Sequence, residues 1–246
     1  MSYDFRNKVI WLTGASKGIG YELAKYLQSQ GARLVLSSRD TSKLNEFNDA
    51  VRLDCDVTSQ EQIQTAVETI EQVYGRLDCI ILNAGDAEYV NVNEFSSDIY
   101  RRMFEVNFFS QVNAIEHCLP LLRKSVAPYI VAMTSSVAWT GLSRGHAYSA
   151  SKAASRNFFQ GLALDLASEN IPVSIICPGF VRTPLTDKND FPMPFLMEPE
   201  NAAKRILIGM QSQKHEIHFP RRFTWLLKLV SMLPAGIRHN LLRRIV

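Results

Sequence analysis

The sequence has few cysteines, and none of them stands in a metal-binding pattern. Cys55, Cys79, Cys118 and Cys177 are the only four among 246 residues, and no Cys-x-x-Cys pair or zinc-type histidine spacing accompanies them. Each of them lies in an apolar segment, as small core residues do. We therefore expect four reduced, buried thiols, no metal site, and a protein of the reducing cytoplasm.

Long apolar runs are also absent. No uncharged stretch approaches the roughly 18 residues of a membrane helix, and residues 1–6 lack the apolar region of a signal peptide. The net charge of +3 gives no reason to expect a nucleic acid or another polyanion as partner. We expect a single domain over residues 1–246, a length that one α/β domain can accommodate.

Acidic residues are missing from the last 30 positions. Residues 217–246 carry +6, which leaves −3 on the first 216 residues because the whole chain carries +3. We call residues 221–246 the C-terminal tail; it predicts two short helices with broad apolar faces, separated at Pro234 and Gly236. Such a segment covers a substrate pocket, joins a subunit interface or rests on a membrane surface. The first two roles are favoured, and peripheral membrane contact is the alternative.

A glycine-rich segment follows the first apolar run. Residues 8–13 are typical of a buried strand, residues 14–20 read Gly-Ala-Ser-Lys-Gly-Ile-Gly, and apolar residues at helical spacing continue to Gly31. Glycines allow the backbone to approach a pyrophosphate, and a helix N-terminus offers free N–H groups and the positive end of its dipole. The order strand, glycine loop, helix predicts a dinucleotide site.

Tyr148 and Lys152 form a second motif. Four residues of separation place both side chains on one face of a helix, one turn apart. An ammonium group beside the phenol is expected to lower the pKa of Tyr148 from its ordinary value of about 10. The pair then forms a proton-transfer device, although most Tyr-x-x-x-Lys pairs are surface features and this one depends on its context.

The Gly-x-x-x-Gly-x-Gly loop together with Tyr148 and Lys152 resembles the classical branch of the short-chain dehydrogenase/reductase family, and the resemblance spans at least residues 8–184. It implies a Rossmann-type, doubly wound α/β fold with a mostly parallel seven-stranded sheet and helices on both faces. Strands are expected at 8–13, 33–38, 51–57, 77–82, 129–134, 171–177 and 216–220. The family commonly forms homo-dimers or homo-tetramers.

The resemblance also implies four catalytic residues: Asn107, Ser136, Tyr148 and Lys152. In the family the asparagine bends its helix, here expected at 98–124, and holds a water that links the lysine to solvent. Alignment through Ser136-Val137-Ala138 selects Ser136, which precedes Tyr148 by 12 residues. Many family members have a spacing of 13, which would select Ser135 instead. We favour Ser136 and assume a one-residue deletion in the intervening loop.

Cofactor contacts are carried over in the same way. The expected set is Gly14, Ser16, Lys17, Gly18, Ile19, Gly20, Arg39, Asp56, Val57, Asn83, Ala84, Gly85, Tyr148, Lys152, Pro178, Gly179, Val181 and Thr183. The second strand ends at Ser38, where an Asp or Glu would hold the ribose hydroxyl of NAD, and Asp40 is expected to point away. Arg39 and Lys17 suit a 2′-phosphate, so we predict NADP(H).

The substrate side is predicted to be apolar. Residues 185–200 are rich in proline and large apolar residues and stand in the place of the family's substrate lid. Candidate pocket residues are Tyr89, Trp139, Leu142, His146 and Phe180. His117 is interpreted as a core or interface histidine rather than a catalytic one.

These features predict an NADP(H)-dependent oxidoreductase that interconverts a carbonyl and a secondary alcohol, with reduction of a small apolar substrate as the favoured direction. Two other classes were weighed. A non-catalytic cofactor sensor or scaffold has little need for Asn107, a serine, Tyr148 and Lys152 together. Epimerase or dehydratase chemistry on a nucleotide sugar fits neither the apolar lid nor the short C-terminal region.

Overall fold

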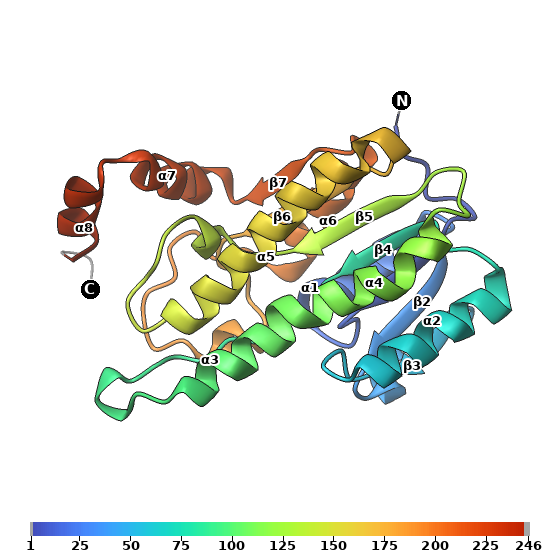
Figure 1. The fold of residues 1–246 in the computed structure, drawn as a ribbon, viewed down its shortest axis with the longest axis horizontal. Coiled ribbons are helices and arrows are strands. Elements are labelled where there is room, and N and C mark those ends of the chain that lie inside the picture. The colour runs from blue at the N-terminus through green and yellow to red at the C-terminus, as the bar shows by residue number, and fades with distance from the viewer. Residues whose placement is uncertain (1, 244–246) are drawn as a thin grey trace.

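Seven parallel strands form one sheet in the computed structural model, which describes residues 2–243 (Figure 1). The strand order is β3-β2-β1-β4-β5-β6-β7. The strands are β1 Val9–Thr13, β2 Arg33–Ser38, β3 Val51–Asp54, β4 Cys79–Leu82, β5 Tyr129–Met133, β6 Val173–Pro178 and β7 Glu216–Phe219. The predicted fold class is confirmed, with every strand pair parallel rather than most of them.

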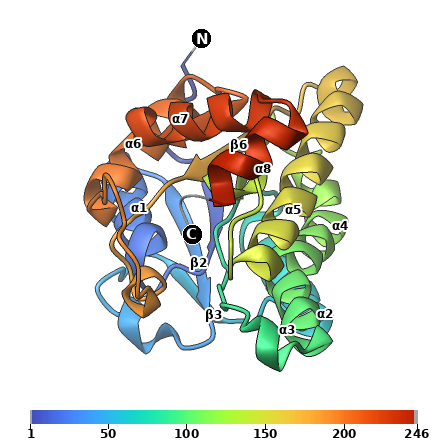
Figure 2. The same cartoon turned by 90° about the vertical axis from the view of Figure 1, so that its left-hand side faces the viewer.

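Helices cover both faces of this sheet (Figure 2). They are α1 Gly18–Ser29, α2 Gln60–Tyr74, α3 Ser97–Phe104, α4 Ser110–Leu122, α5 His146–Asp165, α6 Pro199–Gln211, α7 Arg221–Met232 and α8 Ala235–Arg243. Helices α1 and α6 pack together on one face, and α2, α4 and α5 cover the other. Every residue of β1, β4, β5 and β6 is buried, which explains why these strands are continuous apolar runs. All four cysteines lie in this core as free thiols, as predicted.

The helix predicted at 98–124 is interrupted. A π-helical turn, Glu105–Phe109, separates α3 from α4, and Asn107 is buried within it. Such a turn inserts extra backbone without changing the apolar pattern, so periodicity alone does not reveal it. The interruption agrees with the predicted bend at Asn107.

Sheet order reverses between β1 and β4, because the chain leaves β1 toward β2 and β3 and later returns to its other side. Parallel strands leave a crevice at such a switch point, beyond their carboxyl ends. Several predicted site residues follow those ends directly: Gly14 after β1, Asn83 after β4 and Ser135 soon after β5. The topology therefore brings segments far apart in the sequence to one place.

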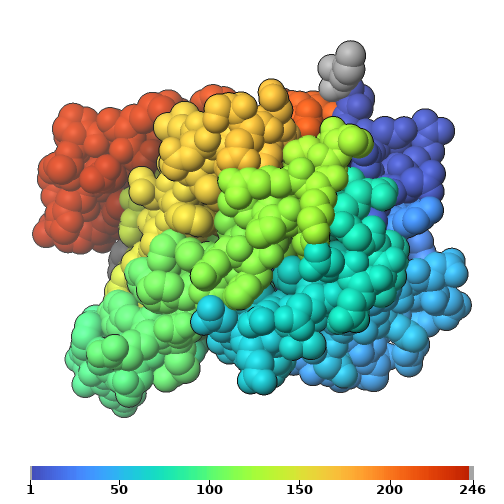
Figure 3. Space-filling view, turned by 45° about the vertical axis from the view of Figure 1, so that its right-hand side comes forward, coloured from blue at the N-terminus to red at the C-terminus, as the bar shows by residue number. Residues whose placement is uncertain are grey.

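The C-terminal tail adds α7 and α8 beyond β7, at the far end of the molecule from the N-terminal residues (Figures 1 and 3). Two separate helices were predicted here, and both are present. Arg244, the last of the six basic residues counted above, lies outside the described residues. Within residues 2–243, no helix combines the length and apolarity needed to cross a membrane.

Candidate active site

One cavity of ≈ 1950 Å³ collects the predicted site. All four predicted catalytic residues and all 18 predicted cofactor residues line it. It runs from the glycine loop past the ends of β4, β5 and β6 to the lid and to α7. The residues predicted from the sequence therefore line one cavity, although the sequence did not reveal the shape of that cavity.

The glycine loop is built for close backbone approach. Gly14 and Gly18 have φ angles of +66° and +58°, a region that favours glycine. A Cβ on Gly20 would lie 2.3 Å from the Gly14 carbonyl oxygen. No side chain caps the first turn of α1, which begins just after Lys17. Its N–H groups are therefore available to an anion, as a pyrophosphate site requires.

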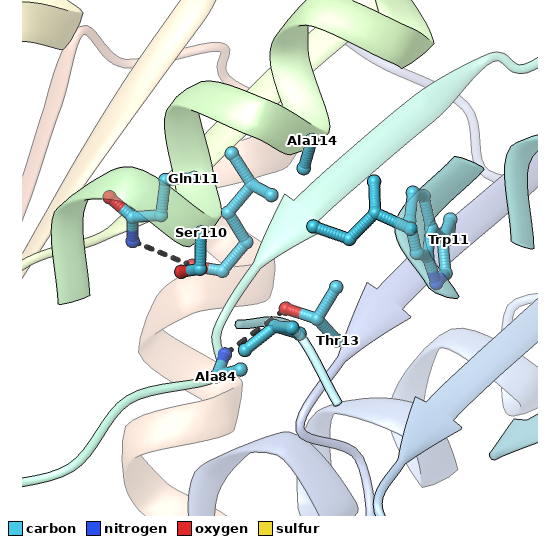
Figure 4. A pocket seen from close by; sticks show the side chains of 9 residues that line it. Trp11, Thr13, Ala84, Ser110, Gln111 and Ala114 are labelled. Atoms are coloured by element: carbon cyan, nitrogen blue, oxygen red, sulfur yellow. Dashed lines mark hydrogen bonds between the residues drawn. The ribbon is translucent and has the colours of Figure 1, made fainter. Parts of the chain in front are cut away.

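The segment Asn83-Ala84-Gly85 holds this loop in place. The side-chain amide of Asn83 donates to the carbonyl oxygens of Thr13 and Gly14, both at 3.0 Å. The Thr13 hydroxyl accepts from the backbone N–H groups of Asn83 and Ala84 at 3.0 and 3.1 Å, and Figure 4 shows the bond from Ala84. These bonds tie the end of β4 to the end of β1 at the switch point.

Gly85 makes room for two catalytic side chains. A Cβ there would meet the Asn107 Oδ1 at 2.8 Å and the Lys152 Nζ at 3.2 Å. The Asn107 amide nitrogen donates to the Asp86 carbonyl oxygen at 2.9 Å and to the Ser151 hydroxyl at 3.2 Å. Asn107 thus connects the π-helical turn, the loop after β4 and α5, and it lies next to Lys152.

Lys152 is 3% exposed, and its ammonium donates to the Met133 carbonyl oxygen at 3.1 Å. Burial lowers the pKa of Lys152 to about 8. Burial also raises the pKa of the half-buried Tyr148 to about 12, against a hydrogen bond from the Ser135 side chain that lowers it. The predicted lowering of the Tyr148 pKa by Lys152 is therefore wrong for this structure. Lys152 Nζ lies 5.9 Å from the centre of the Tyr148 ring, and burial is the largest cause of the shift.

The serine assignment also changes. Ser135 is the serine whose side chain is close enough to the Tyr148 phenol to lower its pKa. Ser136 is 1% exposed and begins the short turn Ser136–Trp139, for which Ser135 is the cap. The geometry therefore favours Ser135 over the predicted Ser136. The spacing to Tyr148 is then 13, and the assumed loop deletion is unnecessary.

Two exposed cations, Arg39 after β2 and Lys17 in the glycine loop, line the cavity. The Ser38 hydroxyl donates to the Asp40 carbonyl oxygen at 2.6 Å, and the Asp40 carboxylate accepts from the Ser42 N–H at 2.9 Å. Asp40 does not line the cavity, as predicted, whereas the exposed side chains of Arg39 and Lys17 do. This end of the cavity is therefore suited to a negatively charged group.

Asp56 and Thr183 already have partners within their own loops. The Asp56 carboxylate accepts from both the N–H and the hydroxyl of Thr58, which holds the pKa of Asp56 below its usual range. The Thr183 N–H donates to the Thr186 hydroxyl at 2.9 Å. These bonds fix the two loops where they line the cavity.

Three of the five predicted substrate-pocket residues, Tyr89, Leu142 and Phe180, line the cavity, and two do not. Trp139 packs its ring beside Lys228 and His218 instead. His146 bonds to the Tyr100 hydroxyl at 2.8 Å and stacks on that ring. The prediction for these two residues is therefore wrong, because their side chains leave the turn and α5 on sides that face away from the cavity.

Sequence reasoning missed a further wall of the pocket. Helix α7 contributes Phe223, Leu226, Leu227 and Val230 to the cavity. The signal was present in the apolar spacing of the tail, and pocket covering was one of the roles it suggested. One face of α7 lines the cavity, in agreement with that role.

The lid closes over the opposite side through three consecutive residues. Lys188 pairs with Asp86 at 3.3 Å, and Asn189 hydrogen-bonds with Tyr89. Asp190 accepts two bonds from Arg144, at 2.9 and 3.0 Å. These polar contacts hold the predicted lid across the cavity.

Comparison with known proteins agrees with this geometry. Residues 8–192 match the family model described as short chain dehydrogenase. The match covers well over half of the sequence, so the chain belongs to the short-chain dehydrogenase family, a family of oxidoreductases with a Rossmann-type fold.

Its curated relatives include an uncharacterized oxidoreductase of Myxococcus xanthus, 28% identical over 95% of this chain and 96% of the relative. Another, from Staphylococcus saprophyticus, is 29% identical over 86% of this chain and 94% of its own length. A short chain dehydrogenase from Burkholderia cenocepacia in complex with NADP superposes with a TM-score of 0.87 at 23% identity, over 98% of this chain and 99% of the other. Thermoplasma acidophilum aldohexose dehydrogenase, in ligand-free form, gives 0.78 at 25% identity over 89% and 94%.

Proposed function

We propose that this oxidoreductase uses NADPH to reduce the carbonyl group of a small apolar compound to a secondary alcohol. One observation carries the proposal. A single cavity joins a glycine loop flanked by two cations to a tyrosine, a serine, a lysine and an asparagine. The first part suits a dinucleotide, and the second suits proton transfer to a carbonyl oxygen.

The residues present fit the dinucleotide. Side chains at Gly14, Gly18 and Gly20 would fill the cradle, and the uncapped start of α1 offers N–H donors to a pyrophosphate. Arg39 supplies a planar donor fork for a 2′-phosphate, and Lys17 adds a second positive charge. The NADP bound to the Burkholderia neighbour is consistent with this choice.

When bound, the cofactor supplies the hydride that reaches the carbonyl carbon. The residues of the chain manage the proton and the geometry. Tyr148, whose raised pKa keeps its phenol protonated near neutral pH, donates that proton to the carbonyl oxygen. Ser135 donates a hydrogen bond to the same oxygen. Lys152 and Asn107 return a proton to Tyr148 from solvent, so the carbonyl gains one hydride and one proton in each turnover.

The proposed substrate follows from the walls of the cavity. Aromatic and aliphatic side chains of the lid, of the loop after β6 and of α7 surround the space beyond Tyr148; examples are Phe180, Phe191, Leu227 and Val230. Several charged side chains line the same cavity but are paired, as Lys188 is with Asp86, Arg102 with Glu88 and Arg144 with Asp190. The surface left for a substrate is therefore largely apolar, which favours an apolar ketone or aldehyde over a sugar or an acid.

Cofactor preference tests this proposal directly. We expect the parent protein to bind NADPH about 10- to 100-fold more tightly than NADH, the value of a charge-assisted phosphate contact. Replacing Ser38 with Asp and Arg39 with Leu should reverse the preference, because the new carboxylate repels the phosphate and accepts from the ribose hydroxyls. Lys43→Leu, an exposed cation that does not line the cavity, is the matched control. Equal affinity of the parent for both cofactors would contradict the proposal.

A further inference from the structure

We propose that the outer face of the C-terminal tail binds the surface of an anionic lipid membrane. The proposal does not depend on the reaction, because it concerns a surface outside the catalytic centre. Helix α7 is apolar on two sides. Phe223, Leu227 and Val230 face inward and are at most 9% exposed. On the outer side Trp225, Leu229 and Met232 are between 52% and 75% exposed.

The next helix extends this surface. Ile237 and Leu241 of α8 are 57% and 38% exposed. The two helices lie together at one end of the molecule, where they project beyond the sheet (Figures 1 and 3). An apolar surface of this extent is uncommon on a monomeric soluble protein and usually marks a contact with a protein or a membrane.

The charge of the tail identifies the partner. Arg221 and Arg222 are exposed at the start of α7, Arg243 is exposed at the end of α8 where it also lines the cavity, and the sequence has no acidic residue after Glu216. A helix with apolar residues on its outer face and arginines at its edges suits the boundary between lipid headgroups and acyl chains. Trp225 suits this boundary because its ring combines an apolar body with one polar N–H group. Anionic headgroups supply the negative charge that the tail lacks.

A second copy of the chain suits this face less well. A two-fold contact through the tail would bring two sets of arginines together, with no carboxylate from either tail to pair with them. Juxtaposed like charges disfavour such an interface. A lipid surface of opposite charge has no such cost.

An ionic contact keeps α7 in position while its outer face stays free. Lys228 pairs with Glu216 of β7, which also accepts from Arg156 of α5 at 2.9 Å. The Lys228 ammonium lies 4.9 and 5.2 Å from the ring centres of Trp139 and Trp225. This cluster attaches the helix to the body of the protein, and Trp225 is the outer residue that takes part in it.

Vesicle co-sedimentation of the full chain tests the proposal. We expect sedimentation with vesicles of mixed phosphatidylcholine and phosphatidylserine, less with phosphatidylcholine alone, and weakening as salt rises. A basic residue near an anionic surface contributes about fivefold in affinity, so Arg221→Gln with Arg222→Gln should lower binding about 30-fold. Lys43→Gln with Lys214→Gln removes the same charge elsewhere and should leave binding near the parent level.

A second pair of variants tests the apolar contribution. Trp225→Ser with Leu229→Ser should abolish sedimentation, whereas Val126→Ser, at a residue 95% exposed in the loop before β5, should not. Thermal unfolding and NADPH binding report whether each variant is folded. If the Trp225 and Leu229 variant does not fold, the Arg221 and Arg222 variant still tests the proposal. The proposal would be overturned if the parent does not sediment with any of these vesicles. It would also be overturned if binding changes neither with lipid charge nor in the arginine and the Trp225–Leu229 variants. So would a concentration-dependent dimer that the Trp225 and Leu229 changes abolish without any lipid binding.

Discussion

The side chains of Tyr148 and Lys152 lie one helical turn apart on α5, where Tyr148 is half-buried and Lys152 is buried. Burial disfavours both charged forms, so it raises the pKa of the phenol and lowers that of the ammonium. The sequence shows the pair but not how deeply the two side chains are buried, and this burial decides whether the pKa of Tyr148 rises or falls. A protonated phenol is also what a proton donor in carbonyl reduction requires.

The Lys152 shift predicts a pH dependence of stability in the cofactor-free protein. Its pKa of about 8 in the folded chain lies below the ordinary 10.5, so the unfolded chain holds more protons between these values and stability rises with pH there. We expect the parent to gain about 2 kcal/mol over Lys152→Met between about pH 7 and pH 9.5, from 1.36 kcal/mol per unit of pKa shift. Denaturant unfolding of both proteins at the two pH values measures this. A difference independent of pH would show that the ammonium is not destabilised by burial.

The two serines predict contrasting kinetics. Ser135→Ala removes the hydroxyl beside the Tyr148 phenol and should lower kcat by about 10²–10³, the usual effect of losing one such donor. Ser136→Ala should have a much smaller effect, since that hydroxyl starts a buried turn. Steady-state kinetics of both variants, with NADPH affinity as the control, decide between them. The reverse ranking would restore the assignment made from the sequence.

Prediction from sequence succeeded for residues that a motif fixes and failed where orientation decides. Gly14, Asn83 and Tyr148 stand at defined distances from strand ends or helix turns, and all of them line the cavity. Trp139 and His146 lie close to the site in sequence, yet their side chains point elsewhere. Sequence spacing does not distinguish side chains that line the cavity from those that point away from it, because a residue in a turn can point in either direction.

At the scale of elements, the π-helical turn and the lid are the features that shape the site. Apart from Asn107, nothing in the sequence indicates the π-helical turn, because apolar residues continue through it. The lid was predicted from its composition, and its attachment was not. Three consecutive lid residues each bond to a different residue across the cavity: Lys188, Asn189 and Asp190. These bonds could not be predicted because a polar surface residue has many possible partners.

The lid contacts predict a change in substrate binding. Arg144→Gln with Asp190→Asn removes a two-bond ion pair that is exposed, so the effect should be modest, about two- to fivefold in KM with little change in kcat or NADPH affinity. The same loss of affinity should appear in the parent at high salt. Arg123→Gln breaks an equally exposed ion pair, with Glu169, far from the cavity and serves as the control. An unchanged KM in the double variant would show that these bonds do not hold the lid.

At the scale of the whole molecule, a parallel sheet could be predicted from the sequence because a helix separates most consecutive strands. A right-handed crossover between parallel strands leaves few arrangements, and the glycine loop identifies β1. The tail is different. Leu227 and Leu229 are the same residue type two positions apart, yet one is buried against the cavity and the other is exposed. Only packing distinguishes them, so the sequence left the role of the tail open.

The arrangement of the whole molecule also explains why one cavity contains both the cofactor-binding residues and the catalytic residues. The switch point provides the dinucleotide end, and the lid and α7 extend it into an apolar chamber with Tyr148 between the two parts. The homo-dimer or homo-tetramer expected from the family would add to this arrangement and stays a prediction.

Hydride transfer by the parent protein and by Tyr148→Phe tests the central claim most directly. Each protein is incubated with NADPH deuterated at the transferred position and a panel of apolar ketones and aldehydes, and the deuterium in the alcohol is measured. We expect a deuterated alcohol from the parent. Tyr148→Phe should lose all but a few per cent of turnover and retain its NADPH affinity, because only the proton donor is removed. Substantial turnover by the variant on a substrate of the parent would contradict the role of Tyr148. Failure of the parent to label any carbonyl while it binds NADPH tightly would contradict the proposed reaction.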